Sequence, residues 1–276
     1  MRLLASLSAA AAVLIGTGAG AAQAVPFPVT TDVPTAIAAN YFASAQTPPP
    51  GANRWSCHSG HNPVVLLHAT AMNQAANFAY LSPMLANAGY CVFSLTYGQT
   101  SWSGNTGGLA KREASAYRQV VPFLDRVLAA TGAAKVDLIG HSQGGPIAQL
   151  ASQRRASRIG TIVGLSASSR GHSDVDELQH ALPARAPGQN YWGPRHPGIR
   201  YVNLATRFDH ISTPYPVTLM PPGPGITNTL IQHVCPASRV GHVGMAFSPT
   251  VGALVRNALD PAHRVRVPCG ENEFPE

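Results

Sequence analysis

The sequence has no run of basic residues of the kind that binds nucleic acids. Its 19 lysines and arginines and 12 aspartates and glutamates give a formal net charge of +7 at pH 7. The positive residues are scattered along the chain, and Arg154 and Arg155 are the only adjacent arginines. Nucleic-acid-binding segments cluster basic residues and interleave them with aromatic ones. We therefore interpret the charge as a solvated basic surface and expect no nucleic-acid partner.

The sequence also lacks a Cys-x-x-Cys motif and any paired Cys/His spacing typical of metal ligands. We expect no metal ion and no organic cofactor. The 4 cysteines instead fit two disulfides, although four cysteines permit three connectivities. Cys57 precedes one predicted strand and Cys91 opens the next, so neighbouring parallel strands would bring them together. This favours Cys57–Cys91, which leaves Cys235 to pair with Cys269.

Beyond the N-terminus, no apolar stretch approaches the length of a membrane span. Residues 1–24 have the features of a secretory signal: Arg2, an apolar run of small residues to about Gly20, and Ala22 and Ala24 in a small-x-small pattern. An anchoring helix is the alternative, but three glycines interrupt a run that is already short. We predict cleavage after Ala24 and a secreted, soluble protein with two disulfides.

The mature chain is predicted to contain one domain of the α/β class. Residues 25–53 are rich in proline and alanine and are interpreted as an extended arm, and residues 54–276 as a single catalytic domain. Short apolar blocks of strand character alternate with helical stretches; they span residues 63–68, 91–95, 135–140, 159–165 and 201–206. This alternation predicts a doubly wound, mostly parallel sheet with helices on both faces. No internal repeat is present.

The sequence pattern predicts the bounds of two helices. Residues 109–130 have apolar side chains at helical spacing, and Pro122 should kink that helix. Near the C-terminus, Ser248 can cap a helix that has Pro249 in its first turn and runs to about Leu259.

One serine lies between glycines where a predicted strand gives way to a predicted helix, in the sequence GHSQG. A nucleophile elbow holds its serine in a strained backbone, which crowds the residues two before and two after it. Gly140 and Gly144 provide the space around Ser142. The same turn directs the backbone N–H of Gln143 toward the oxygen of an attacked carbonyl. A helix-capping serine between packing glycines is the alternative interpretation.

A serine nucleophile needs a base, and the base needs an acid to orient it. In this architecture the acid and then the histidine follow the serine along the chain. Asp209 is our candidate acid because it follows the strand at 201–206 at its carboxyl end. The other acids between Ser142 and His242 lie in a polar segment interpreted as an exposed loop; they are Asp174, Asp176 and Glu177.

His242 is the candidate base, since a flexible loop just before the last helix suits a proton shuttle. The other histidines after the candidate acid fit the role less well: His210 adjoins the acid, His233 is interpreted as a packed strand residue, and His263 follows the final helix. His68 and His141 flank the site and are interpreted as residues that pack or orient it.

These residues resemble the secreted bacterial lipases and esterases of the α/β-hydrolase superfamily, particularly the actinobacterial triacylglycerol lipase group. The segments that carry the resemblance lie between about Cys57 and Cys269; they include GHSQGG, TRFDHISTPY, CPASRVGHVGMAF and NALDPAH. The resemblance implies a triad of Ser142, Asp209 and His242. It also implies that HAT stands at the oxyanion loop, so that the backbone N–H of Thr70 joins that of Gln143. Ala69 occupies the position of the family's glycine, and alanine resists a positive φ.

The resemblance implies an ester hydrolase that acts on acyl esters or lipids, including lipids at a lipid–water interface, without a cofactor, and we expect a monomer. Two alternatives remain open at this point. An acyltransferase or a polyester hydrolase would use the same three residues with another acceptor or substrate. A hydrolase fold without activity would serve as a binding module.

Overall fold

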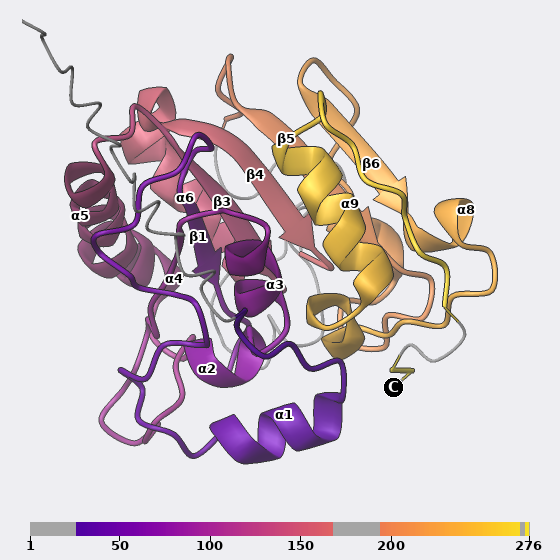
Figure 1. Cartoon of the computed structure of the whole chain (residues 1–276), viewed down its shortest axis with the longest axis horizontal. Coiled ribbons are helices and arrows are strands. Elements are labelled where there is room, and N and C mark those ends of the chain that lie inside the picture. The colour runs from indigo at the N-terminus through magenta and orange to yellow at the C-terminus, as the bar shows by residue number, and fades with distance from the viewer. Residues whose placement is uncertain (1–25, 168–193, 271–273, 276) are drawn as a thin grey trace, which may run out of the picture.

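A computed structural model describes residues 26–167, 194–270 and 274–275 (Figure 1). The predicted signal segment, residues 1–24, and the acids Asp174, Asp176 and Glu177 lie outside these described residues.

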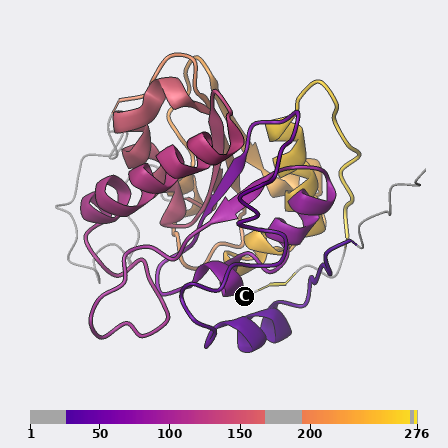
Figure 2. The same ribbon diagram turned by 60° about the vertical axis from the view of Figure 1, so that its left-hand side comes forward.

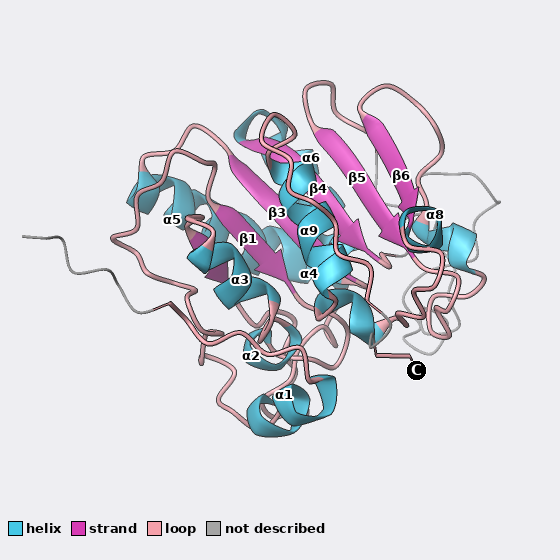
Figure 3. Ribbon diagram, turned by 45° about the vertical axis from the view of Figure 1, so that its right-hand side comes forward, coloured by secondary structure: helices cyan, strands magenta, loops and turns pink. Residues whose placement is uncertain are grey.

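Six strands, all parallel, form the central sheet of the described chain in the order β2-β1-β3-β4-β5-β6 (Figure 3). The strands are β1 Val64–Leu67, β2 Val92–Ser94, β3 Val136–His141, β4 Ile159–Leu165, β5 Arg200–Ala205 and β6 Ile226–Leu230. The prediction of a mostly parallel sheet is therefore confirmed, and each of the five predicted strands lies within a residue or two of its predicted bounds. β6, an edge strand, was not predicted as a separate strand.

Helices cover both faces of this sheet. They are α1 Val33–Asn40, α2 Gln74–Asn77, α3 Leu81–Asn87, α4 Arg112–Ser115, α5 Val121–Thr131, α6 Gly144–Arg155, α8 Ile231–Val234 and α9 Pro249–Leu259. In Figure 2 the helices coloured dark magenta to red-pink, α5 and α6, lie on one side of the sheet and the yellow helix α9 on the other. The alternation of side chains along a strand explains this arrangement. Val65 and Leu67 of β1 pack with α5 and α6, whereas Val64 and Leu66 pack with α3 and α9.

The predicted helix at 109–130 is interrupted by a π-helical turn, Ala116–Val120, between α4 and α5. The interruption directly precedes Pro122, which occupies the first turn of α5. Proline has no N–H to donate and clashes with the preceding turn, so the helix widens there. The C-terminal helix begins as predicted, with the Ser248 side chain accepting a hydrogen bond from the N–H of Val251.

Part of the N-terminal arm is helical rather than extended. Asp32 caps α1 by accepting a hydrogen bond from the N–H of Thr35. Val33 and Ala36 of this helix join the core on the α3 and α9 side. The arm is held further by Asn73, whose amide donates to the carbonyl of Tyr41 at 2.9 Å.

The cysteines form two disulfides, Cys57–Cys91 and Cys235–Cys269, which are the pairs that the sequence predicts. The first joins the segment before β1 to the residue before β2. The second joins the segment after α8 to the C-terminal segment. No described helix is long and apolar enough to cross a membrane.

Candidate active site

Ser142 lies at the carboxyl end of the sheet, between β3 and α6. Its backbone has φ +52°, a conformation that non-glycine residues seldom adopt. A Cβ on Gly140 would lie 2.2 Å from the carbonyl carbon of Gly144, and a Cβ on Gly144 would lie 2.0 Å from the carbonyl oxygen of Leu67. Only glycine fits at either position. The crowding fixes the tight turn that lifts Ser142 above the sheet, where its side chain is half-buried.

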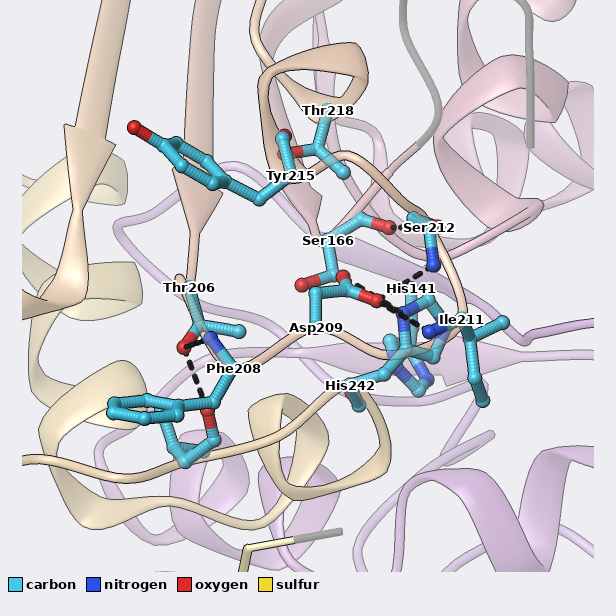
Figure 4. A network of polar contacts seen from close by, with 11 residues as sticks. His141, Ser166, Thr206, Phe208, Asp209, Ile211, Ser212, Tyr215, Thr218 and His242 are labelled. Atoms are coloured by element: carbon cyan, nitrogen blue, oxygen red, sulfur yellow. Dashed lines mark hydrogen bonds and ion pairs between the residues drawn. The ribbon is translucent and has the colours of Figure 1, made fainter.

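Asp209 and His242 form a buried pair near the same end of the sheet (Figure 4). Asp209 follows β5, and His242 directly precedes the short 3-10 helix η4, Val243–Ala246. Nδ1 of His242 lies 3.0 Å from Oδ1 and 2.9 Å from Oδ2 of Asp209. The backbone N–H groups of Ile211 and Ser212 also donate to Oδ1, at 3.0 and 2.6 Å. The carboxylate is therefore fixed in position and holds one edge of the imidazole.

These contacts keep Asp209 ionised. Burial by itself raises the pKa of a carboxyl group, but the hydrogen bond and charge of His242 and the N–H of Ser212 outweigh it, so the pKa of Asp209 is lowered. A carboxylate on Nδ1 selects the tautomer in which Nδ1 carries the proton. The other ring nitrogen, Nε2, then has a free lone pair and can accept a proton.

The backbone of His242 is held beside the elbow by His141, the residue next to Ser142. Nε2 of His141 lies 2.9 Å from the backbone carbonyl oxygen of His242, and the centroids of the two rings are 5.2 Å apart. Asp209 and His242 thus lie beside His141, the residue that precedes Ser142 at the carboxyl end of β3 (Figure 4).

The two residues predicted for the oxyanion hole, Thr70 and Gln143, both lie close to Gly108. A Cβ on Gly108 would lie 2.8 Å from Oε1 of Gln143 and 3.1 Å from Cα of Thr70. The segment around Gly108 is tied to the loop after β1 by two backbone hydrogen bonds, from the N–H of Ala71 to the carbonyl of Gly107 and from the N–H of Gly107 to the carbonyl of Met72. Backbone pairing therefore fixes this loop beside the elbow.

Ala69 does not carry the positive φ that a glycine at its position would permit. The positive φ in this loop falls on Ala71, at +56°. The backbone N–H of Ala69 instead donates to Oδ1 of Asn77 at 2.9 Å. The loop therefore accommodates alanine by turning two residues later than expected.

His68 is a buried structural residue next to this loop. Its ring stacks on Tyr97 with centroids 4.2 Å apart, and its Nε2 accepts the N–H of Tyr97 at 3.1 Å. Nδ1 therefore carries the ring proton and donates to the carbonyl of Ala69 at 2.7 Å. Burial lowers the pKa of His68 to about 4, so its ring is neutral.

The prediction for His233 was wrong. It lies on the short helix α8 after β6, with an exposed side chain, and not in a packed strand. The apolar block TLIQHV contains both the end of β6 and α8, and a short apolar run does not reveal such a boundary. His263 forms an exposed ion pair with Asp260 at 3.0 Å, away from Asp209. Among the described residues, no group of three or more His, Cys, Asp or Glu side chains could hold a metal ion.

Comparisons with known proteins agree with this architecture. Residues 61–166 match the model of the lipase family described as class 2, which is less than half of the chain. The chain is 19% identical to lipase B of Aspergillus fumigatus with a TM-score of 0.58, and the match covers 77% of this chain and 55% of that one. It is 12% identical to the carboxylesterase CesB of Bacillus subtilis with a TM-score of 0.52, covering 84% of this chain and 98% of that one. The chain has the α/β-hydrolase fold. It spans little more than half the length of the fungal lipase.

Two parts of this candidate site were not predicted from the sequence. The loop around Gly107 and Gly108 crosses the oxyanion loop, and a Cβ on Gly107 would lie 2.1 Å from the carbonyl oxygen of Tyr97. The adjacent glycines were the available signal for this close approach. Asn77 contacts His141 across 64 residues of sequence, and no local pattern indicates such a contact.

Proposed function

We propose that this α/β-hydrolase is a secreted serine ester hydrolase of the lipase or carboxylesterase type. One observation supports the proposal most strongly: the buried Asp209–His242 pair lies directly against the elbow that carries Ser142. The match to class 2 lipases, which includes the elbow, supports an ester or lipid as substrate. Two disulfides support a protein that works outside the reducing cytoplasm.

In the proposed mechanism, Nε2 of His242 takes the proton of the Ser142 hydroxyl as its oxygen attacks the ester carbonyl. Asp209 remains ionised and stabilises the imidazolium that forms. The backbone N–H groups of Gln143 and Thr70 stabilise the oxyanion of the tetrahedral intermediate. His242 then donates its proton to the leaving alcohol, which leaves an acyl group on Ser142.

Water completes the cycle. His242 removes a proton from a water molecule, whose oxygen attacks the acyl-enzyme. As the second tetrahedral intermediate collapses, the bond to Ser142 breaks, His242 returns its proton to the Ser142 oxygen, and the carboxylic acid is released. The three side chains and water account for every proton and bond in the proposed steps, which use no metal ion or organic cofactor.

The decisive experiment measures hydrolysis of a soluble p-nitrophenyl ester together with labelling by a fluorophosphonate probe. Wild type should hydrolyse the ester and take up one probe per chain at Ser142. Ser142→Ala should take up no probe and should lose about 10⁴- to 10⁶-fold in kcat. A folded Ser142→Ala variant with full activity would exclude the proposed nucleophile. Wild type that neither labels nor hydrolyses esters would indicate an inactive binding module.

Adding an alcohol to the same assay separates hydrolysis from acyl transfer. A hydrolase should release mainly the free acid, because water is the acceptor of the acyl group. Predominant formation of the new ester would indicate an acyltransferase. A series of p-nitrophenyl esters of increasing acyl length, followed by an insoluble polyester, would then define the substrate class.

A further inference from the structure

His141 lies between the proposed nucleophile and two other parts of the site. It is the last residue of β3, is 2% exposed, and directly precedes Ser142. Its Nε2 lies 2.9 Å from the backbone carbonyl oxygen of His242, and its Nδ1 lies 3.1 Å from Oδ1 of Asn77. A residue of the elbow therefore contacts the backbone of the proposed base across 101 residues of sequence.

Asn77 extends this connection to the oxyanion loop. It is fully buried on α2, and its Oδ1 accepts the backbone N–H of Ala69 at 2.9 Å. Ala69 directly precedes Thr70, whose N–H is proposed to bind the oxyanion. One amide oxygen thus holds the backbone next to Thr70 and also contacts the ring of His141.

We propose that His141 and Asn77 are positioning residues: His141 fixes the backbone of His242 against the elbow, and Asn77, packed beside the His141 ring, fixes the oxyanion loop by accepting the N–H of Ala69. This inference rests on the proposed function, because it assigns to the pair the geometry that Ser142, His242 and Thr70 need. Neither side chain touches the reacting atoms. Their effect is to set where the base and the oxyanion donors lie.

The available hydrogen-bond partners determine which nitrogen of His141 carries the proton. Both nitrogens face oxygen atoms, which only accept hydrogen bonds. The orientation of the Asn77 amide is fixed by the N–H of Ala69, so Oδ1 already has a donor at 2.9 Å. The carbonyl of His242 accepts a longer backbone hydrogen bond, from the N–H of Met245 at 3.3 Å. The longer existing bond at the His242 carbonyl and the shorter contact both assign the proton to Nε2, which donates to His242. Nδ1 then carries a lone pair and packs against Oδ1 of Asn77 without a hydrogen bond to it.

Burial supports a single ring proton on His141. Desolvation, followed by the nearby charge of His242, lowers the pKa of His141 to about 3, so the ring is neutral at the pH at which esterases are assayed. A neutral ring with Nε2–H makes one directed hydrogen bond to the base loop. Because buried polar groups carry a desolvation cost, an apolar side chain would fill this position more favourably if packing were its only role.

Glutamine and asparagine variants distinguish the two nitrogens. A glutamine amide nitrogen reaches the position of Nε2, whereas an asparagine amide nitrogen reaches only that of Nδ1. We expect His141→Ala and His141→Asn to lower kcat about 10- to 100-fold on a soluble ester with KM within about twofold of wild type, since small displacements of catalytic groups cost this much. His141→Gln should restore kcat to within about threefold. His263→Gln, at an exposed histidine, is the matched control.

Asn77→Ala should also lower kcat about tenfold or more, because the oxyanion loop loses its tether. The double variant His141→Ala/Asn77→Ala should be less impaired than the product of the two single losses, since the two residues share a contact. Independent effects that multiply fully would contradict a positioning pair.

The wild-type protein provides a test that needs no folded variant. ¹⁵N-labelled histidine should show His141 as a neutral ring protonated at Nε2, with the resonance assigned by its loss in His141→Gln or, if that variant does not fold, by its contacts to His242. A ring protonated at Nδ1 would overturn the proposal, as would equal rates for the glutamine and asparagine variants. Ser142→Ala is assayed in parallel. If Ser142→Ala stays active, the proposed function is wrong. If Ser142→Ala is inactive while His141→Ala is fully active, only the inference about His141 is refuted.

Discussion

At the residue scale, this protein contains two aspartate–histidine pairs, one buried and one at the surface. Asp209 and His242 are buried at 2.9 Å, and Asp260 and His263 lie at the surface at 3.0 Å. We predict that Asp209→Asn lowers kcat by roughly 10⁴-fold, because an amide cannot hold the imidazole in the productive tautomer. Asp260→Asn should leave kcat within about twofold of wild type. Steady-state assays on one soluble ester, with circular dichroism to confirm folding, compare the two variants. Similar losses in both would mean that Asp209 has been misassigned.

The lowered pKa of His68 predicts how the stability of the protein depends on pH. Its pKa is lowered from 6.5 to about 4 in the folded protein, so between these values the unfolded chain binds more protons. Stability must then fall as pH decreases through this window. We expect His68 to contribute a loss of about 2 kcal/mol between pH 7 and pH 5, from about 1.4 kcal/mol for each unit of pKa difference.

Urea unfolding at the two pH values measures this effect. His68→Gln, whose amide oxygen can still accept the N–H of Tyr97, should reduce the pH-dependent loss by that amount. An identical loss in wild type and His68→Gln would show that His68 does not remain neutral.

At the element scale, the strand–turn–helix unit around Ser142 has no space for side chains at its two glycines. We predict that Gly140→Ala and Gly144→Ala each destabilise the protein by more than about 3 kcal/mol or prevent folding, because the atoms in the way are backbone atoms. Gly60→Ala is the control: a Cβ there meets nothing within 4 Å, and the change should stay within about 0.5 kcal/mol. Urea unfolding of the three variants gives the comparison, and a Gly144→Ala protein of normal stability would contradict the tight turn.

The elements also show which features a single sequence can indicate. β1, β3 and β4 were predictable because both faces are buried, which leaves continuous apolar runs. β6 was missed because this edge strand reads ITNTL, with exposed polar residues in its middle. The candidate triad was predicted from spacing and order along the chain. The contacts of Asn77 and His141 were not, since they depend on how distant loops fold against each other.

At the scale of the whole molecule, the two disulfides hold the edges of the fold. Cys57–Cys91 ties the segment before β1 to the start of β2, and Cys235–Cys269 ties the C-terminal segment to the chain that leads to His242. Both bonds have the same sequence separation, 34 residues. In the chain-entropy model, removing either bond increases the conformational entropy of the unfolded state by the same amount. The two bonds should therefore contribute similarly to stability.

We predict that Cys57→Ser/Cys91→Ser and Cys235→Ser/Cys269→Ser each lower the free energy of unfolding by about 3 to 4 kcal/mol. The kcat at 25 °C should stay close to that of wild type in both variants, because Asp209 and His141 hold His242 independently of either bond. Guanidinium unfolding and ester hydrolysis, measured on the same preparations, test both statements. If Cys235→Ser/Cys269→Ser keeps its stability but loses kcat, the second disulfide positions His242 directly. The contacts of Asp209 and His141 would then not be sufficient to position it.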